Sequence, residues 1–281
     1  MSGLRFISTA FVVLALCGAT LIGEASAADA TWTGAFIGAN LGAGWASKAN
    51  QSLSDSYIDA AHMPALGPSF FLPINIHADG ALGVLGGFQA GYNWQSKSNW
   101  LIGVEGDWSW TGVKGGNSVP LVLSPGLGAP PGPNGAVATA HSSPREIASL
   151  RGRVGYAMPN WMAYVTGGGA WTRLNFTGDA SCGLFVCLSG LHAPVDFSAG
   201  RWGWVIGGGI ELKAGSSPWT FGVEYLRYEF DGTNTKAGLL VNPAGAPAAT
   251  GGCAVGTCFS HYSFGDLTIN EVRLRLNYKL N

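Results

Sequence analysis

The 281-residue sequence predicts an all-β protein, an eight-stranded antiparallel transmembrane β-barrel. Three observations support this fold class. Eight segments alternate between apolar and small or polar residues with a period of two, which is typical of strands and argues against helices. The connections between these segments are alternately long and short, and the eleven tryptophans lie near the segment ends. Bacterial outer-membrane barrels share this pattern, with short periplasmic turns and, here, four long extracellular loops.

The composition is unlike that of a cytosolic globular protein. Charged residues make up only 11% of the chain, where about 25% is usual. Fifteen Lys and Arg residues balance sixteen Asp and Glu residues, which gives a net charge of −1. Because there is no basic excess to neutralise a phosphate backbone, we expect no nucleic-acid partner.

The first 27 residues have the features of a cleaved secretory signal peptide. Arg5 provides a positive start, residues 6–16 are apolar and uncharged, and Ala25-Ser26-Ala27 forms an A-x-A cleavage site. A membrane-anchoring helix is the alternative, but the flanking residues and the cleavage site favour removal. We therefore expect a single barrel domain over residues 28–281, without Cys17. No later stretch of about 18 uncharged apolar residues predicts a spanning helix.

The first four predicted strands lie before residue 157. In the first, Ile37 and Leu41 share one face, whereas Gly38, Asn40 and Gly42 share the other. These four segments cover residues 35–43, 86–94, 102–109 and 149–156. Most are about ten residues long, which is the length that a tilted strand needs to cross a bilayer.

The C-terminal half supplies four more segments with the same period. They cover residues 163–172, 202–212, 219–225 and 272–280. The last is the clearest, because Leu274 and Leu276 alternate with Arg273 and Arg275.

The connections separate into two classes. Three are short, at residues 95–99, 159–160 and 213–218, and four are long, at roughly 46–82, 112–147, 174–200 and 231–268. Long connections without secondary structure are uncommon in compact soluble domains. We therefore assign the short turns to the periplasmic side and the long connections to the extracellular side.

The tryptophans predict two girdles at the membrane interfaces. Those expected at the short-turn rim are Trp32, Trp94, Trp100, Trp161 and Trp219, and those toward the long-loop rim are Trp45, Trp108, Trp110, Trp171, Trp202 and Trp204. An indole has one apolar and one polar side, which suits the headgroup level. The alternative, a secreted β-sandwich with core tryptophans, would not sort them by strand end.

The same alternation predicts a charged lumen. An arginine facing lipid at mid-depth costs about 2–4 kcal/mol, so the arginines of the last strand are expected to point inward. Extending this orientation to all strands gives a lumen network of Glu105, Asp107, Arg151, Arg153, Glu211, Glu224, Arg273, Arg275 and Lys279. Because eight strands enclose only enough space for side chains, we expect a plugged barrel. Arg227 and Glu229 break the pattern, and we expect them above the headgroups or beside a bulge.

Several strand sequences resemble the alpha-proteobacterial outer-membrane immunogenic protein family. The similarity lies in residues 32–42 (WTGAFIGANLG), 89–95 (QAGYNWQ), 164–168 (YVTGG) and 223–226 (VEYL). It implies a small OmpA-like barrel, surface-exposed and often antigenic, with no catalytic residues. The implied partners are outer-membrane lipid, lipopolysaccharide and the barrel-assembly machinery, which usually reads a final aromatic residue; this chain finishes Leu280-Asn281.

Four cysteines remain in the predicted mature chain, as two closely spaced pairs. They are Cys182 and Cys187, and Cys253 and Cys258. Four cysteines allow three connectivities, and the short spacing with an oxidising surface favours the two local bridges. A metal site with His192 or His261 is the alternative, but neither loop has the ligand set of a structural zinc site. We predict no metal and no cofactor.

The predicted function is structural: envelope integrity and surface interaction, without catalysis. One alternative is a narrow porin-like channel through the lumen. Another is binding of haem, a host molecule or another surface ligand by the long loops, where the sequence places the five histidines His62, His77, His141, His192 and His261. A lipid-modifying enzyme is a third, although no spacing marks a catalytic His and Ser pair.

Overall fold

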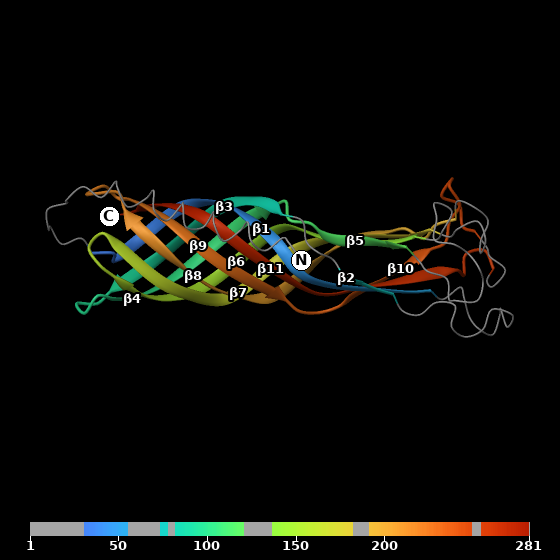
Figure 1. Cartoon of the computed structure of the whole chain (residues 1–281), viewed down its shortest axis with the longest axis horizontal. Helices are drawn as coiled ribbons and strands as arrows, with labels where there is room; N and C mark the ends of the chain where they lie inside the picture. Colours follow the sequence, from blue (N-terminus) through green and yellow to red (C-terminus); the bar gives the residue numbers. More distant parts are fainter. Residues whose placement is uncertain are drawn as a thin grey trace, which may run out of the picture.

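The computed structural model describes residues 31–55, 74–77, 82–120, 137–181, 191–248 and 254–280. All regular secondary structure in these ranges is β, and none of it includes a helix long and apolar enough to span a membrane. The molecule is an elongated β-structure, with the barrel at one end and a narrower extension at the other (Figure 1). The predicted signal peptide lies outside the described residues and stays a prediction.

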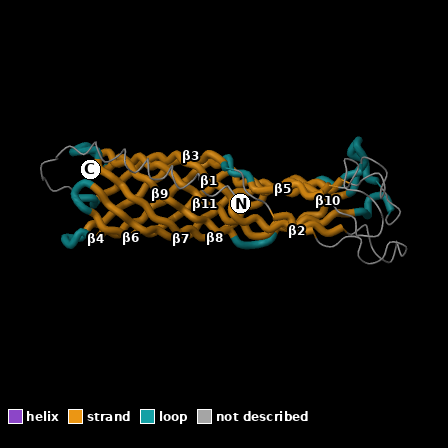
Figure 2. Tube along the Cα trace, in the orientation of Figure 1, coloured by secondary structure: helices purple, strands orange, loops and turns teal. Residues whose placement is uncertain are grey.

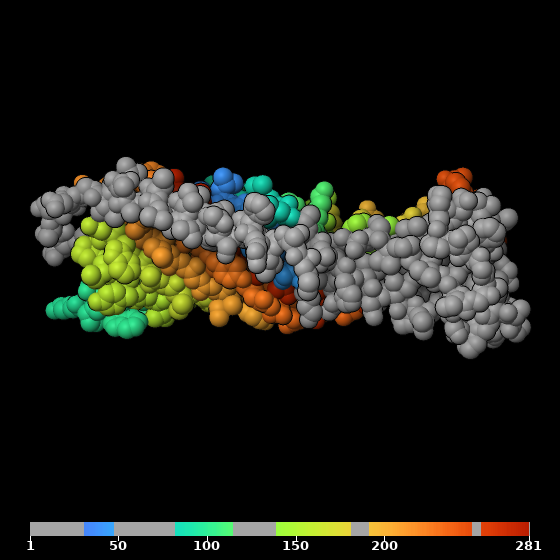
Figure 3. Space-filling view, in the orientation of Figure 1, coloured from blue at the N-terminus to red at the C-terminus, as the bar shows by residue number. Residues whose placement is uncertain are grey.

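Eight long strands form a closed barrel. They are β1 (Gly34–Asp55), β3 (Gly83–Gln95), β4 (Trp100–Thr111), β6 (Val137–Ala157), β7 (Trp161–Ser181), β8 (Val195–Lys213), β9 (Trp219–Phe230) and β11 (Phe259–Lys279). Each strand pairs antiparallel with its neighbours. The last strand, β11, pairs with the first, β1, in a register that begins at Phe36↔Lys279, and this pairing closes the ring. The predicted eight-stranded antiparallel barrel is confirmed, and the strands cross its wall diagonally in contact with one another (Figure 3).

Three tight turns join the strands at one end, where the sequence predicts short connections. Ser96 N donates to Trp100 O, Met158 N to Trp161 O and Ala214 N to Trp219 O, at 2.8–3.0 Å. Asn99 (φ 64°) and Gly215 (φ 62°) adopt the left-handed backbone conformation in two of these turns. Asn and Gly tolerate this conformation best, so the local sequence fits the turn geometry.

The long connections differ from the prediction, because the strands continue far into them. β1 has 22 residues, and β6, β7 and β11 have 21 each, about twice the length that crosses a bilayer. Three short strands, β2 (Ile74–His77), β5 (Gly115–Pro120) and β10 (Asn234–Leu239), pair with β1, β6 and β11. We call these strands and the outer halves of the long ones the extension (Figure 2).

The sequence pattern failed there because the polarity of the two faces inverts along each strand. In the barrel, β7 exposes Val165 outward and buries Thr166 inward. Farther along the same strand the outward face carries Arg173, and the inward residues are Leu174 and Phe176, which are fully buried. Outside a membrane the outer face meets water, so the core must be inside, as in a soluble β-protein.

One arginine stabilises the junction between barrel and extension. β11 pairs with β9 up to Leu267↔Phe230 and with β10 from Phe264↔Asn234, so its backbone changes partner between these pairs. Arg201 donates from Nη1 to Gly265 O (2.5 Å), from Nη2 to Phe264 O and from Nε to Asn234 Oδ1 (2.7 Å). The guanidinium therefore satisfies carbonyls where strand pairing is interrupted.

The interior has three levels along the axis. At the short-turn end lies an apolar cluster of Trp32, Leu101, Ala157, Met162 and Tyr164. A larger apolar cluster lies in the extension and in the adjoining end of the barrel. It includes Phe176, Tyr228, Phe230, Tyr262 and Phe264. Between them the inward side chains are charged.

Candidate functional site

The middle level of the interior is a charged layer contributed by five strands. Its members are Glu105 and Asp107 of β4, Arg151 and Arg153 of β6, Glu211 of β8, Glu224 of β9, and Glu271, Arg273 and Arg275 of β11. Every member is at most 7% exposed. Four arginines and five carboxylates give the layer a formal charge of −1.

Arg151 lies at the centre of the layer and contacts three carboxylates. Its Nη2 lies beside Glu105 Oε1 and 3.0 Å from Asp107 Oδ2, and its Nη1 lies 3.0 Å from Glu224 Oε1. The Ser149 hydroxyl donates to Asp107 Oδ2 as well. Arg151 therefore joins β4, β6 and β9 across the lumen.

Arg273 binds a set of carboxylates that overlaps with that of Arg151. Its Nη2 lies 2.6 Å from Glu224 Oε2, and its Nη1 lies 3.3 Å from Asp107 Oδ1 and 3.6 Å from Glu271 Oε1. Because Glu224 and Asp107 each bind both arginines, removing one partner leaves the others buried and incompletely neutralised.

Arg275 and Arg153 extend the layer toward the short-turn end. Arg275 Nη1 lies 2.9 Å from Glu224 Oε1 and donates to the Tyr164 hydroxyl at 2.5 Å. Arg153 Nη1 lies 3.2 Å from Glu211 Oε1, and its guanidinium carbon lies 4.5 Å from the centre of the Phe36 ring. The guanidinium carbons of Arg153 and Arg275 also lie 5.3 and 5.7 Å from the centre of the Tyr164 ring, and these cation–π contacts connect the charged layer to the apolar cluster.

A chain of amides borders the layer on the side of β1 and β3. Ser109 donates to Asn40, Asn40 donates to Gln89, and Gln89 donates to Asn277 at 2.6 Å. Asn277 Nδ2 then donates to Glu211 Oε2 at 3.2 Å. The lumen is therefore crosslinked in two directions, by ion pairs and by amides.

The structure places eight of the nine predicted lumen residues in the charged layer. Lys279 lies apart from them, partly exposed at the short-turn rim, where its Nζ donates to Thr31 O at 2.9 Å. Lys279 occupies an inward position in the alternation of β11, as predicted. It is, however, the last residue of the strand and lies closer to the short-turn end than the carboxylates do.

Sequence analysis missed two members of the buried network, Glu271 and Tyr164. Glu271 has the same parity as Arg273, so the pattern could have identified it if the last strand had been extended by one residue. Tyr164 has inward parity on β7 and donates to Glu224 Oε1 at 2.9 Å. Its importance depends on a contact between strands that alternation alone does not indicate.

Ten of the eleven tryptophans lie on the outward face, and Trp32 is the exception. Trp32 is 4% exposed, its Nε1 donates to Met158 O at 2.7 Å, and Lys213 Nζ lies 4.8 Å from its ring centre. The girdle assignment for Trp32 is wrong because the residue precedes β1, where strand parity does not apply. It forms part of the apolar cluster at the short-turn end instead.

The outward tryptophans pair with other rings across neighbouring strands. Trp100 contacts Tyr156 and Trp219 contacts Tyr278 at the short-turn rim, with ring centres 6.0 and 5.0 Å apart. Trp108 and Trp171 lie 6.1 Å apart nearer the extension.

Arg227 and Glu229 face outward with no register shift in β9. Arg227 Nη2 lies 3.8 Å from Glu229 Oε2, and Glu229 pairs in register with Trp204 of β8. The bulge considered from the sequence does not form. The two residues instead lie at the level of Trp204, in the girdle nearer the extension, where the outer face of the barrel begins to be polar.

The cysteine and histidine positions give no metal cluster in the described part of the chain. Cys258 is disulfide-bonded, but Cys182, Cys187 and Cys253 lie outside the described residues, so its pairing stays a prediction. His77, His141 and His261 lie in β2, β6 and β11 rather than in loops. No three His, Cys, Asp or Glu side chains among the described residues gather as metal ligands.

Comparisons with known proteins identify a family and two sequence relatives. Residues 13–279 match the family described as outer membrane protein beta-barrel domain. The chain is 30% identical over 236 residues to the 31 kDa outer-membrane immunogenic proteins of Brucella melitensis and Brucella suis, covering 79% of this chain and 84% of each relative. The outer membrane protease OmpT from Escherichia coli aligns over 88% of this chain and 97% of its own, with a TM-score of 0.44 and 7% identity.

The family match covers nearly the whole chain, and the alignment with the relatives covers more than two thirds of both proteins. The protein therefore belongs to the outer-membrane β-barrel family that includes these immunogenic proteins, and its place is the bacterial outer membrane.

Proposed function

We propose that this protein is a structural, surface-exposed component of the outer membrane, with a plugged lumen and no catalytic activity. The observation that supports this proposal best is the charged layer, whose nine members are buried between two apolar clusters. A solute crossing the barrel would have to separate ion pairs that share carboxylates. It would also have to displace aromatic side chains above and below them.

Electrical recording tests the plugged lumen. We expect the purified, folded protein to give no discrete conductance steps in planar bilayers. Replacing both Arg151 and Arg273 with serine removes the two central guanidinium groups and is expected to produce steps or flickering current. Arg227→Ser and Arg173→Ser, which change outward residues, are the matched controls and are expected to stay silent. Steps from the unmodified protein would support the narrow channel instead.

A contribution to envelope integrity is testable in cells. Deletion of the gene is expected to increase sensitivity to dodecyl sulfate, and the unmodified gene is expected to restore resistance. Unchanged sensitivity on deletion would argue against this role. Lipid A of unaltered mass after overexpression is the result expected of a protein without lipid-modifying activity.

The proposed partners follow from the two environments of the chain. The outward apolar face meets outer-membrane lipid and lipopolysaccharide, and insertion requires the barrel-assembly machinery. The extension carries β-structure well beyond the tryptophan girdles and is the surface that a host molecule or other ligand would meet first.

A further inference from the structure

The charged layer contains one more carboxyl group than it has arginines. Four guanidinium groups balance four of the five carboxyl groups, and every member of the layer is buried. A buried carboxylate without a partner is costly, because it cannot regain its hydration, and in practice such a group takes up a proton. The arrangement of the ion pairs indicates which of the five carboxyl groups is in excess.

Four of the carboxyl groups are closely paired with arginines. Glu224 lies within 3.0 Å of three guanidinium groups, and Glu105 contacts all four of the layer. Asp107 and Glu211 each contact two, with nearest distances of 3.0 and 3.2 Å. The four arginines are therefore shared among these four carboxylates.

Glu271 is the fifth carboxyl group, and its pairing is weaker. Within the described ranges it contacts one arginine, whose Nη1 (Arg273) lies 3.6 Å from Glu271 Oε1, too far for a hydrogen bond. The same nitrogen lies closer to Asp107 Oδ1, at 3.3 Å. Glu271 Oε1 is buried, and no group in the described part of the chain donates a hydrogen bond to it. A side-chain hydrogen bond joins the carboxyl group to Tyr228.

The neighbouring strands place apolar groups beside Glu271. It pairs in register with Leu226 of β9, which is fully buried, and with Gly44 of β1. A Cβ at Gly44 would meet Leu85 of β3 and Val113, at 3.0 and 3.2 Å. None of these groups stabilises a negative charge, and apolar surroundings favour the neutral form of a carboxyl group.

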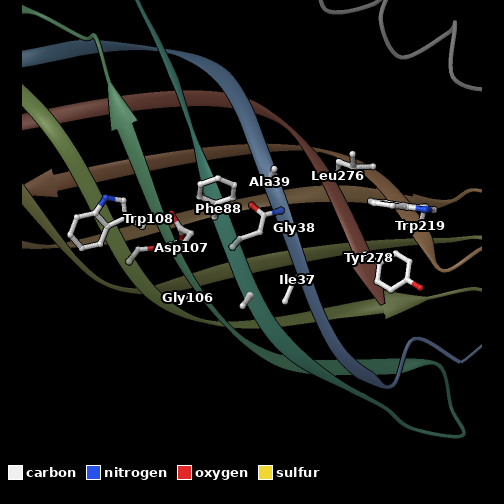
Figure 4. Close-up of a pocket in the computed structure, with 13 residues that line it drawn as sticks. Ile37, Gly38, Ala39, Phe88, Gly106, Asp107, Trp108, Trp219, Leu276 and Tyr278 are labelled. Carbon is white, nitrogen blue, oxygen red and sulfur yellow. Dashed lines mark hydrogen bonds between the residues drawn. The ribbon is translucent and has the colours of Figure 1, made fainter. Parts of the chain in front are cut away.

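The charged groups that face Glu271 are Arg273 of its own strand, Asp107 of β4 and Glu224 of β9. Asp107 precedes Trp108, which lies on the outward face of the barrel (Figure 4). Arg273 already binds both of these carboxylates, with its Nη2 2.6 Å from Glu224 Oε2. An ionised Glu271 would share this one arginine with two other negative charges, and carboxylates that share a site do not all ionise together.

We propose that Glu271 is a proton-binding site of the lumen. Its carboxyl group holds a proton while the other four carboxyl groups are ionised, so the layer is neutral. Loss of this proton to water would leave a buried negative charge and loosen the ion pairs that Arg273 makes with Asp107 and Glu224. The plug is then pH-sensitive and is tightest when the site is occupied. This second step rests on the plugged lumen of the proposed function, whereas the proton site does not.

Infrared spectroscopy of the full chain, folded into phospholipid vesicles, detects the proton directly. A neutral carboxylic acid has a C=O stretching band that a carboxylate lacks. We expect this band at about pH 6, where an exposed glutamate is ionised, and we expect Glu271→Gln to remove it. Glu229→Gln, the same change at an outward residue whose side chain is 25% exposed, is the matched control and is expected to retain the band.

Urea unfolding at a series of pH values gives an independent measurement. An unfolded glutamate ionises above about pH 4.3, so between that pH and the pH at which the site empties the folded chain binds one more proton than the unfolded chain. Across this window the unfolding equilibrium constant of the unmodified protein is expected to rise, relative to that of Glu271→Gln, by up to about ten-fold per pH unit. Below the window the two proteins are expected to be similarly stable, because an amide has the shape of a neutral carboxyl group.

Conductance in planar bilayers tests the second step. At a pH where the infrared band has disappeared, the unmodified protein is expected to give flickering current, whereas Glu271→Gln is expected to stay silent. A mobility shift on boiling in dodecyl sulfate verifies that each variant is folded.

The possible failures are distinguishable. Absence of the band at about pH 6, its retention in Glu271→Gln, or parallel pH dependence of the two unfolding constants would overturn the proton site. Silence of the unmodified protein after the band is lost would overturn the pH-sensitive plug. Current from the unmodified protein while the band is still present would contradict the plugged lumen itself, and the infrared spectra would still decide the proton site.

Discussion

At the scale of single residues, the charged layer makes some positions far more sensitive than their chemistry suggests. Arg273 and Arg227 are both arginines with carboxylate neighbours. Arg273 is 1% exposed and lies near four carboxylates, whereas the Arg227 side chain is 45% exposed and, within the described ranges, forms an ion pair with one carboxylate, that of Glu229. Burial, rather than the number of ion pairs, determines how much stability is lost when the arginine is replaced. A buried carboxylate that loses its arginine cannot be solvated by water instead.

We predict that Arg273→Leu lowers the free energy of unfolding by about 3–5 kcal/mol, since it leaves Glu224 and Asp107 buried and underneutralised. Arg227→Leu is predicted to change it by about 0–1 kcal/mol, as expected of an exposed pair. Urea unfolding in phospholipid vesicles, followed by tryptophan fluorescence, measures both. Equal effects would show that the layer does not act as a network.

A second prediction concerns two neighbouring glycines of β7. Gly168 points inward, and a Cβ there would overlap Leu150 O and lie 2.8 Å from Arg151 Cα, whereas Gly169 points outward into open space. Gly168→Ala is therefore predicted to destabilise the protein by about 1–3 kcal/mol, the usual cost of overpacking. Gly169→Ala is predicted to be nearly neutral. The same urea titration compares them, and a larger effect at Gly169 would contradict the assigned strand parity.

At the scale of elements, the outward face of a long strand meets lipid in the barrel and water in the extension. The outward face of β7 carries Val165 in the barrel and Thr177 in the extension. One strand therefore obeys the membrane rule over its first half and the water-soluble rule over its second. The change occurs between Trp171 and Arg173, and a corresponding change on β9 occurs between Tyr225 and Arg227.

This inversion gives an element-scale prediction. Val165→Arg is predicted to cost about 2–4 kcal/mol of folding free energy in vesicles, because it places an arginine against lipid near mid-depth. Thr177→Arg, on the same face of the same strand, is predicted to be tolerated because that face meets water. Folding yield into vesicles measures the difference. A similar loss for both variants would mean that the girdles do not mark the membrane.

At the scale of the whole molecule, closure of the sheet by β1 and β11 determines how the protein responds to detergent. The β1–β11 pairing runs in register from Phe36↔Lys279 to Ala46↔Ile269, so the barrel wall has no free strand edge along this length. A sheet without edges satisfies its backbone hydrogen bonds internally, and detergent has little access to them.

We therefore predict heat-modifiable electrophoretic mobility for the outer-membrane fraction. The unboiled protein is expected to migrate as a compact species in dodecyl sulfate, and boiling is expected to shift it to the position of the unfolded chain. Absence of a shift, together with recovery of the protein from the soluble periplasmic fraction, would favour a secreted β-sandwich and contradict the barrel.

The sequence alone predicted the barrel, its eight strands and its three short turns. It could do so because the membrane imposes a strict alternation on each strand, and Arg273 and Arg275 cannot face lipid next to Leu274 and Leu276. Local rules of this kind can be read from one strand at a time. The same alternation identified eight members of the charged layer, since parity depends only on position within a strand.

Only the tertiary structure decided the extension, the burial of Trp32 and the pairing within the layer. In the extension the outward face meets water and the inward face becomes apolar, so the rule that identified the barrel strands no longer applies. Trp32 lies before β1, and its contact with Met158 depends on how the short-turn end is packed. Contacts such as Arg151 with Glu224 join strands far apart in sequence, and closure of the sheet determines which side chains meet.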